Sequence, residues 1–117
     1  MTEAIPLRIL DTGVMEGRRN IAIGQAIIEA HRAGRVPDTL RFLRFPPTAL
    51  VGRHQALGQE IDLDSCRSHG IGVVRRNTGG GAIYRDPGQL GGEWASRRDR
   101  LGGGALELAA QLSCEAA

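Results

Sequence analysis

The chain has 117 residues and a formal net charge of +2, with 41% apolar but only 3% aromatic residues. This length suits one small domain whose core is built from small aliphatic side chains. The weak positive charge gives no argument for a nucleic-acid partner, and no apolar run is long enough to predict a membrane span. All fifteen basic residues are arginines, so the chain can supply no lysine to a reaction. Cys66 and Cys114 share no metal-ligand spacing, which predicts free thiols in a cytoplasmic protein and no metal site.

The first half of the chain predicts strands around one helix. Residues 7–10 form a short apolar strand. Apolar residues at helical spacing then predict a helix that Asn20 caps and Gly34 ends. Residues 39–45 alternate polar and apolar side chains, which indicates a half-buried strand, and residues 48–55 predict another strand that runs into a turn.

The second half predicts a short helix and further strands. The helix covers residues 64–69, with Asp62 or Asp64 as its cap. The strands are expected at residues 71–74, 82–84 and 89–96. Residues 97–100 predict a solvated turn, and the apolar spacing after a second triple glycine predicts a helix over residues 105–117. The fold class that follows is α+β, a mixed β-sheet with flanking helices.

A glycine-rich loop joins two of the predicted strands. It contains Arg75, Arg76, Thr78 and three consecutive glycines, residues 79–81. Such glycines weaken a strand but let the backbone turn successive N–H groups toward one anion. The guanidinium forks of the two arginines suit a phosphate or a carboxylate. A flexible hairpin with a solvated arginine pair is the alternative interpretation.

This loop resembles the signature of the lipoate-protein ligases, which belong to the biotin/lipoate protein ligase family. The family pattern is Arg-Arg-x-Ser/Thr-Gly-Gly-Gly-Ala-x-Tyr/Phe-His-Asp, and residues 75–86 follow it except that Arg85 replaces the histidine. Gly52, Arg53 and Gln55 match a second family pattern, Gly-Arg-x-Gln. His54 lies at its variable position, so we expect a surface histidine rather than a catalytic base.

The helix region also resembles the family, with one departure. The family helix begins Asn-Leu-Ala-x-Glu-Glu, whereas this chain has Gly24 and Gln25 in place of the acidic pair. The resemblance extends over residues 7 to 95, and it implies that residues 1–117 are the N-terminal part of a biotin/lipoate ligase-like catalytic domain. We expect a C-terminal half or a second polypeptide to complete that domain.

The resemblance also implies a set of ligand-binding residues. In the family the loop wraps the acyl-adenylate, so Arg76 is expected to hold its carboxyl or phosphate region, while Arg75 faces the other side of its strand. Arg85 is either a phosphate ligand or the mark of a diverged, inactive site. The full set expected to bind the substrate or adenylate comprises Arg53, Arg75, Arg76, Thr78, Gly79, Gly80, Gly81, Tyr84, Arg85, Asp86 and Gln89.

Three functions follow from the resemblance. The first is ATP-dependent ligation, in which lipoate and ATP with Mg²⁺ form lipoyl-AMP and the lipoyl group passes to a lysine of an acceptor domain. The family lysine that assists this reaction lies after the region of resemblance, so the catalytic residue is not identified here. The second is octanoyl or lipoyl transfer without ATP, which needs a nucleophile. The third is a non-catalytic subunit that binds a ligand or a partner.

Overall fold

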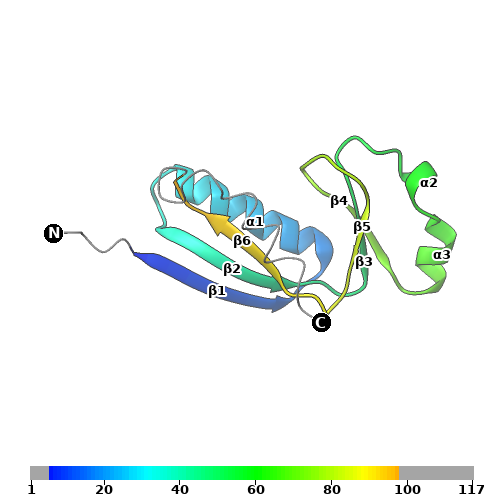
Figure 1. Cartoon of the computed structure of the whole chain (residues 1–117), viewed down its shortest axis with the longest axis horizontal. Coiled ribbons are helices and arrows are strands. Elements are labelled where there is room, and N and C mark those ends of the chain that lie inside the picture. The colour runs from blue at the N-terminus through cyan, green and yellow to red at the C-terminus, as the bar shows by residue number, and fades with distance from the viewer. Residues whose placement is uncertain (1–5, 98–117) are drawn as a thin grey trace.

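The structure is a computed structural model that describes residues 6–97, and its architecture is α+β, as the sequence predicts (Figure 1). The elements in chain order are β1 (Leu7–Val14), α1 (Gly17–Arg32), β2 (Asp38–Arg44), β3 (Thr48–Val51), α2 (Leu57–Glu60), α3 (Leu63–Ser68), β4 (Gly72–Arg75), β5 (Ile83–Arg85) and β6 (Gly91–Ala95). The predicted 97–100 turn and the predicted helix over residues 105–117 extend beyond the described residues. Within residues 6–97, no helix is long and apolar enough to cross a membrane.

The strands form two three-stranded sheets rather than one. In the first sheet, β2 lies between a parallel β1 and an antiparallel β6. In the second, β3 lies between a parallel β4 and an antiparallel β5. Figure 1 shows the sheets side by side, with α1 along the first sheet and α2 and α3 beyond the second. The α1 helix is the crossover that parallel pairing of β1 and β2 requires.

The first strand is longer than predicted. The sequence predicts a strand over residues 7–10, but β1 continues to Val14. Its pairing with β2 is irregular between Asp11 and Val14. Gly13 has a φ of 66°, and its N–H donates to Asp11 Oδ1 at 2.9 Å. A positive φ costs glycine little, so this turn fits inside the strand as a bulge.

The start of α1 corrects a second prediction. Asn20 is not the helix cap, because the helix begins at Gly17 and Glu16 caps it. The Glu16 carboxylate accepts from the backbone N–H groups of Arg18 and Arg19 at 3.0 and 3.2 Å. A carboxylate at this end also interacts favourably with the helix dipole. At the other end, Gly34 adopts a positive φ of 71° just after the helix, as a C-terminal glycine commonly does.

Asn20 instead belongs to a buried polar network. It is fully buried, as is Arg41 of β2. Arg41 Nη2 donates to Asn20 Oδ1 at 2.6 Å, and Arg41 Nε donates to Thr12 Oγ1 at 3.0 Å. Asn20 Nδ2 donates to the carbonyls of Met15 and Arg44 at 3.0 and 2.8 Å. Since buried polar groups are costly unless paired, these bonds fix the first turns of α1 against β1 and β2.

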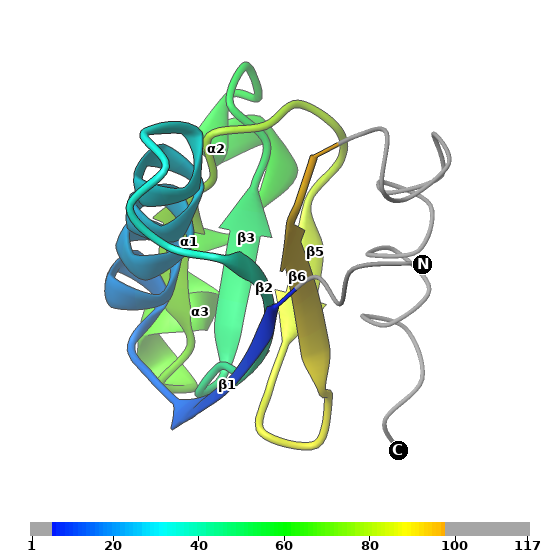
Figure 2. The same cartoon turned by 90° about the vertical axis from the view of Figure 1, so that its left-hand side faces the viewer.

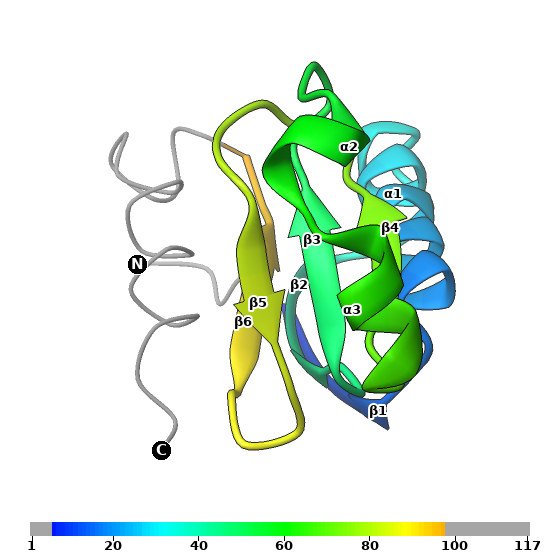
Figure 3. The same ribbon diagram turned by 90° about the vertical axis from the view of Figure 1, so that its right-hand side faces the viewer.

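The apolar core lies where the two sheets meet. Its buried members are Leu43, Phe45, Leu50 and Val74, with the half-buried Ile21 of α1 packed against them. Figures 2 and 3 view the molecule from its two ends and show α1 and α3 to one side of β3, with β5 and β6 to the other. Three of these four buried residues are aliphatic, as the low aromatic content predicts, and Phe45 is the exception.

The middle of the chain is more helical than predicted. The predicted strand and turn over residues 48–55 are present, since β3 ends at Val51 and a turn follows at residues 53–54, but the short helix α2 after it was not predicted. Asp62 caps α3, accepting from the N–H of Ser65 at 3.0 Å, so the first of the two predicted caps is confirmed.

Candidate functional site

A pocket of about 360 Å³ lies between α1, the two sheets and the glycine-rich loop. Apolar side chains from both sheets and from α1 line most of it, and polar side chains come from the loop, α1, β5 and β6. Its lining residues are Ile21, Gly24, Gln25, Ile28, Leu43, Phe45, Leu50, Arg76, Asn77, Thr78, Ile83, Arg85, Gly91, Gly92 and Glu93. The pocket therefore joins an apolar floor to a loop that is rich in hydrogen-bond donors.

The Arg76 side chain is hydrogen-bonded to the backbone of the glycine-rich loop. Its Nη2 donates to the carbonyls of Gly79 and Gly81 at 2.9 and 2.7 Å, and its Nε donates to Gly79 at 3.3 Å. Gly80 between them has a φ of 105°, a conformation that side-chain-bearing residues rarely adopt. Within residues 6–97, the N–H groups of Gly79, Gly80 and Gly81 donate no hydrogen bond. The carbonyls of Gly79 and Gly81 are thus paired, while the three glycine N–H groups stay available for a ligand.

Arg75 holds the neighbouring turn. Its Nη1 donates to the carbonyls of Gly52, Arg53 and Gln55 at 3.0, 3.1 and 2.7 Å. This turn also supports the glycine-rich loop, because the N–H of Arg53 donates to the carbonyl of Thr78 at 2.9 Å. Arg75 does not line the main pocket, so its guanidinium braces the turn against the loop.

Gly52 belongs to the site, although it is not among the predicted site residues. It is buried, and a Cβ at this position would collide with the carbonyl oxygen of Gly80. Gln55 closes the same turn, since its Oε1 accepts from the N–H of Gly52 at 2.8 Å. The match of both residues to the Gly-Arg-x-Gln pattern is the signal that could have identified them.

A second, more polar groove adjoins the loop. Arg53, Arg75 and Arg76 line it, together with Gln25, Asn77 and Thr78. The three arginines give this groove a positive charge that attracts anions, while the guanidinium of Arg75 itself is bound to backbone carbonyls. Five of the predicted site residues line the two hollows beside the loop: Arg53, Arg75, Arg76, Thr78 and Arg85.

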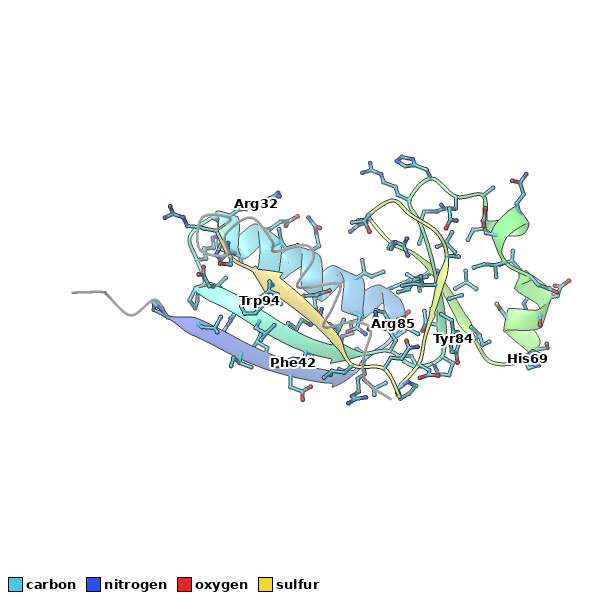
Figure 4. All side chains as sticks on the ribbon, in the orientation of Figure 1. Arg32, Phe42, His69, Tyr84, Arg85 and Trp94 are labelled. Atoms are coloured by element: carbon cyan, nitrogen blue, oxygen red, sulfur yellow. The ribbon has the colours of Figure 1, made fainter. Side chains whose placement is uncertain are left out.

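Arg85 enters the main pocket from β5. Its guanidinium carbon lies 5.4 Å from the centroid of the Phe45 ring, within cation–π distance. Its Nη2 lies 2.5 Å from where a Cβ of residue 91 would be, so the glycine at that position makes room for it. Figure 4 shows Arg85 at the junction of the two sheets.

Six predicted site residues line neither hollow: Gly79, Gly80 and Gly81 of the loop, and Tyr84, Asp86 and Gln89 beyond it. Tyr84 is 47% exposed and lies between the two pocket-lining residues of β5, so strand alternation turns it away from the pocket. Asp86 Oδ1 accepts from the N–H of Gly88 at 2.9 Å, and its carbonyl accepts from the N–H of Gln89 at 3.1 Å. Asp86 and Gln89 thus form the turn between β5 and β6.

The described residues contain no evident nucleophile at the pocket. Cys66 is buried in α3 and does not line it. His54 is exposed, in agreement with the surface role that the sequence favours. Within residues 6–97, no three His, Cys, Asp or Glu side chains gather into a group that could hold a metal ion.

Known proteins resemble this chain over most of its length. The family model described as lipoyl protein ligase A/B catalytic domain matches residues 16–115. Octanoyltransferase LipM of Moorella thermoacetica is 49% identical over 80 residues, which cover 68% of this chain and 29% of that protein. Octanoyltransferase LipM of Symbiobacterium thermophilum is 42% identical over 107 residues, covering 91% of this chain and 39% of that protein.

Solved structures agree with the family. A putative lipoate protein ligase from T. acidophilum with bound lipoic acid has a TM-score of 0.67 and 34% identity, covering 74% of this chain and 36% of that one. A lipoate-protein ligase A bound with ATP has a TM-score of 0.66 and 35% identity, and the match covers 75% of this chain and 35% of that one. The chain therefore spans well under half the length of these relatives. With its glycine-rich loop and pocket, it belongs to the lipoyl protein ligase A/B catalytic domain family.

Proposed function

We propose that this chain is the acyl-binding part of an octanoyltransferase, which moves an octanoyl group to a lysine of a lipoyl-acceptor domain. The relatives named octanoyltransferase LipM, at 49% and 42% identity, support transfer over the ATP-dependent ligation that the loop first suggests. Residues 1–117 would then be the N-terminal part of the catalytic domain.

The observation that carries the proposal is the pocket itself. Leu43, Phe45 and Leu50 offer buried apolar surface at the junction of the sheets. Burial of an alkyl chain there gains about 0.8 kcal/mol per methylene. Arg76 and Thr78 at the loop end of the same pocket provide polar groups for the carbonyl end of the chain.

The loop donors suit acyl transfer. A nucleophile that attacks a thioester carbonyl forms a tetrahedral oxyanion, and the C–S bond then breaks as the thiol leaves with a proton. The lysine amine of the acceptor attacks the resulting acyl group in a second step, forms an amide and returns the nucleophile. Donors at the loop end of the pocket, from Arg76 and Thr78, would stabilise the oxyanion, and the nucleophile would come from outside residues 6–97.

The test is transfer of octanoate from an octanoyl thioester to a purified lipoyl domain, followed by intact-mass spectrometry. The chain is expressed with any segment that its gene carries downstream of Ala117, and residues 1–117 alone serve as the comparison. We expect the acceptor to gain one octanoyl group without ATP from the longer chain, and no transfer from residues 1–117 until the downstream part is added in trans. Transfer only when ATP is supplied would overturn the proposal.

ATP-dependent lipoate ligation is the second candidate. The groove of Arg53, Arg75 and Arg76 beside the loop fits the phosphates of a nucleotide, and the 35% identical ligase structure contains ATP. Lipoate, ATP and Mg²⁺ would then be needed, and lipoyl-AMP would form with release of pyrophosphate. Lipoate-dependent pyrophosphate release in the longer chain would support this candidate. Tight binding to a second polypeptide without either activity would indicate a non-catalytic subunit.

A further inference from the structure

Two arginines line the main pocket from different ends of the second sheet. At one end of β3, the N–H of Arg76 donates to the carbonyl of Val51 at 2.9 Å. At the other end, Arg85 of β5 pairs with Thr48. Since β3 is four residues long, about 10 Å of strand lies between these two positions. Figure 1 shows the same arrangement, with the glycine-rich loop at one end of the second sheet and the end of β5 at the other.

The side chains of these two arginines contact different parts of the pocket wall. The guanidinium of Arg76 is bonded to the carbonyls of Gly79 and Gly81 in the loop. That of Arg85 lies 5.4 Å from the centroid of the Phe45 ring and beside Gly91 of β6. Arg76 therefore stays with the loop, while Arg85 reaches the junction of the two sheets (Figure 4).

The pocket wall between the two arginines is apolar. Leu50 lies on β3 between the two positions, and Leu43 and Phe45 lie at the junction of the sheets. All three side chains are buried and line the pocket. An alkyl chain that runs along them gains binding free energy with every methylene that it buries. A ligand with its polar end at Arg76 would extend along this wall toward Arg85.

The gain per methylene ends where the chain meets the Arg85 guanidinium. This group has little freedom to move aside, because its Nη2 lies 2.5 Å from where a Cβ of residue 91 would be, and its Nε and Nη2 atoms are buried. A guanidinium does not lose its proton in proteins, so the charge persists at every working pH. A methylene pressed against it would remove water from a charged group, which is costly.

We propose that the polar guanidinium of Arg85 limits the length of the acyl chain that the pocket binds. The inference rests on the proposed function: the carbonyl end lies at Arg76 and Thr78, the octanoyl chain fills the apolar wall, and Arg85 ends it. The family pattern has a histidine at this position, which is largely neutral at pH 7 when unperturbed. A permanently charged end to the apolar wall is therefore a feature of this chain.

The test compares hexanoate, octanoate and decanoate by calorimetric titration, on the chain with any downstream segment of its gene. We expect the affinity to rise about tenfold from hexanoate to octanoate, because two more methylenes are buried. From octanoate to decanoate it should change by less than about threefold. Arg85→Met places an unbranched apolar side chain at the end of the wall, so decanoate should then bind about tenfold more tightly than octanoate.

Two control variants separate polarity from size and from net charge. Arg85→Gln introduces a side chain of about the size of methionine that is still polar, and it should keep the wild-type limit. Arg67→Met removes the same charge on α3, where the Arg67 side chain is 81% exposed and lines neither hollow, and it should also keep the limit.

A gain for decanoate in Arg85→Gln as large as in Arg85→Met would overturn the inference, since size alone would then set the limit. Decanoate binding about tenfold more tightly than octanoate in the wild-type protein would also overturn it, even if no Arg85 variant folds. Both outcomes leave the proposed function intact. Failure of octanoate itself to bind would overturn the proposed function and this inference together.

Discussion

Replacement of Gly52 by alanine tests whether the turn after β3 fixes the glycine-rich loop. The new methyl group would collide with the carbonyl oxygen of Gly80 and would approach Gln55 Oε1 at 3.3 Å. The carbonyl cannot move freely, because Arg76 bonds the carbonyls on both sides of it. Overpacking of this kind costs about 1–3 kcal/mol when the backbone must adjust.

We expect that strain to appear mainly as a displaced loop. A shift of about 1 Å in a positioning group can lower a rate about 100-fold, so Gly52→Ala should reduce octanoyl transfer by about that factor. Its free energy of unfolding should fall by about 1–3 kcal/mol. The measurements are the initial transfer rate at saturating thioester and unfolding in urea followed by circular dichroism.

Gly58→Ala provides the control, because a Cβ at Gly58 would meet no atom within 4 Å and its φ is not positive. This variant should keep the full transfer rate and gain a few tenths of a kcal/mol at most from better helix propensity. A transfer rate of Gly52→Ala within about twofold of Gly58→Ala would refute the argument, since about 0.4 kcal/mol is too little for a displaced loop.

Five further substitutions test other parts of the structure. Gly80→Ala, at a φ of 105°, should weaken octanoate binding about tenfold or more in calorimetric titration, because the loop must leave a conformation that alanine avoids. Arg76→Lys should lower the affinity for octanoate more than tenfold, since an ammonium group cannot replace the planar guanidinium fork. Arg75→Ala should act mainly by loosening the turn after β3, which lowers the melting temperature. A larger loss of octanoate affinity in Arg75→Ala than in Arg76→Lys would show that the roles of the two arginines are reversed. Asn20→Ala should cost about 2–4 kcal/mol in urea unfolding, because it leaves buried donors and acceptors without partners. Hydrogen bonds from the N–H groups of α1 lower the pKa of Glu16, and the bond from Arg18 has the largest effect. The ionised Glu16 carboxylate therefore stabilises the fold fully above its ordinary pKa, and this stabilisation is lost as the pH falls through the lowered pKa. Glu16→Gln should flatten this pH dependence in acid unfolding curves.

Elements with a local signal could be predicted from the sequence. The alternation over residues 39–45 predicts β2, which runs Asp38–Arg44, and residue type reduces the cap of α3 to two candidates, of which Asp62 is the one used. In the glycine-rich loop, Gly80 adopts a φ of 105°, a conformation that its residue type allows. Each of these depends on contacts within a few residues, which a sequence pattern records directly.

Features that depend on distant contacts could not be predicted. Asn20 has the propensity of a helix cap, but its side chain is taken by Arg41, 21 residues away. Gly24 of α1 lies close to the Glu93 carboxylate of the last described strand. No sequence spacing predicts that these two residues are neighbours. Arg75 has the chemistry of an anion ligand, yet three backbone carbonyls of the preceding turn surround its guanidinium.

The order of the strands has a consequence for how the chain folds. The first sheet is interrupted in sequence, because β2 ends at Arg44 and its partner β6 begins only at Gly91. The whole second sheet, from Thr48 to Arg85, is inserted between them. Formation of that contiguous unit shortens the effective loop that β6 must close, and so reduces the entropy lost when it pairs. In pulse-labelling hydrogen exchange, the amides of β3 and β4 should therefore gain protection before those of β6.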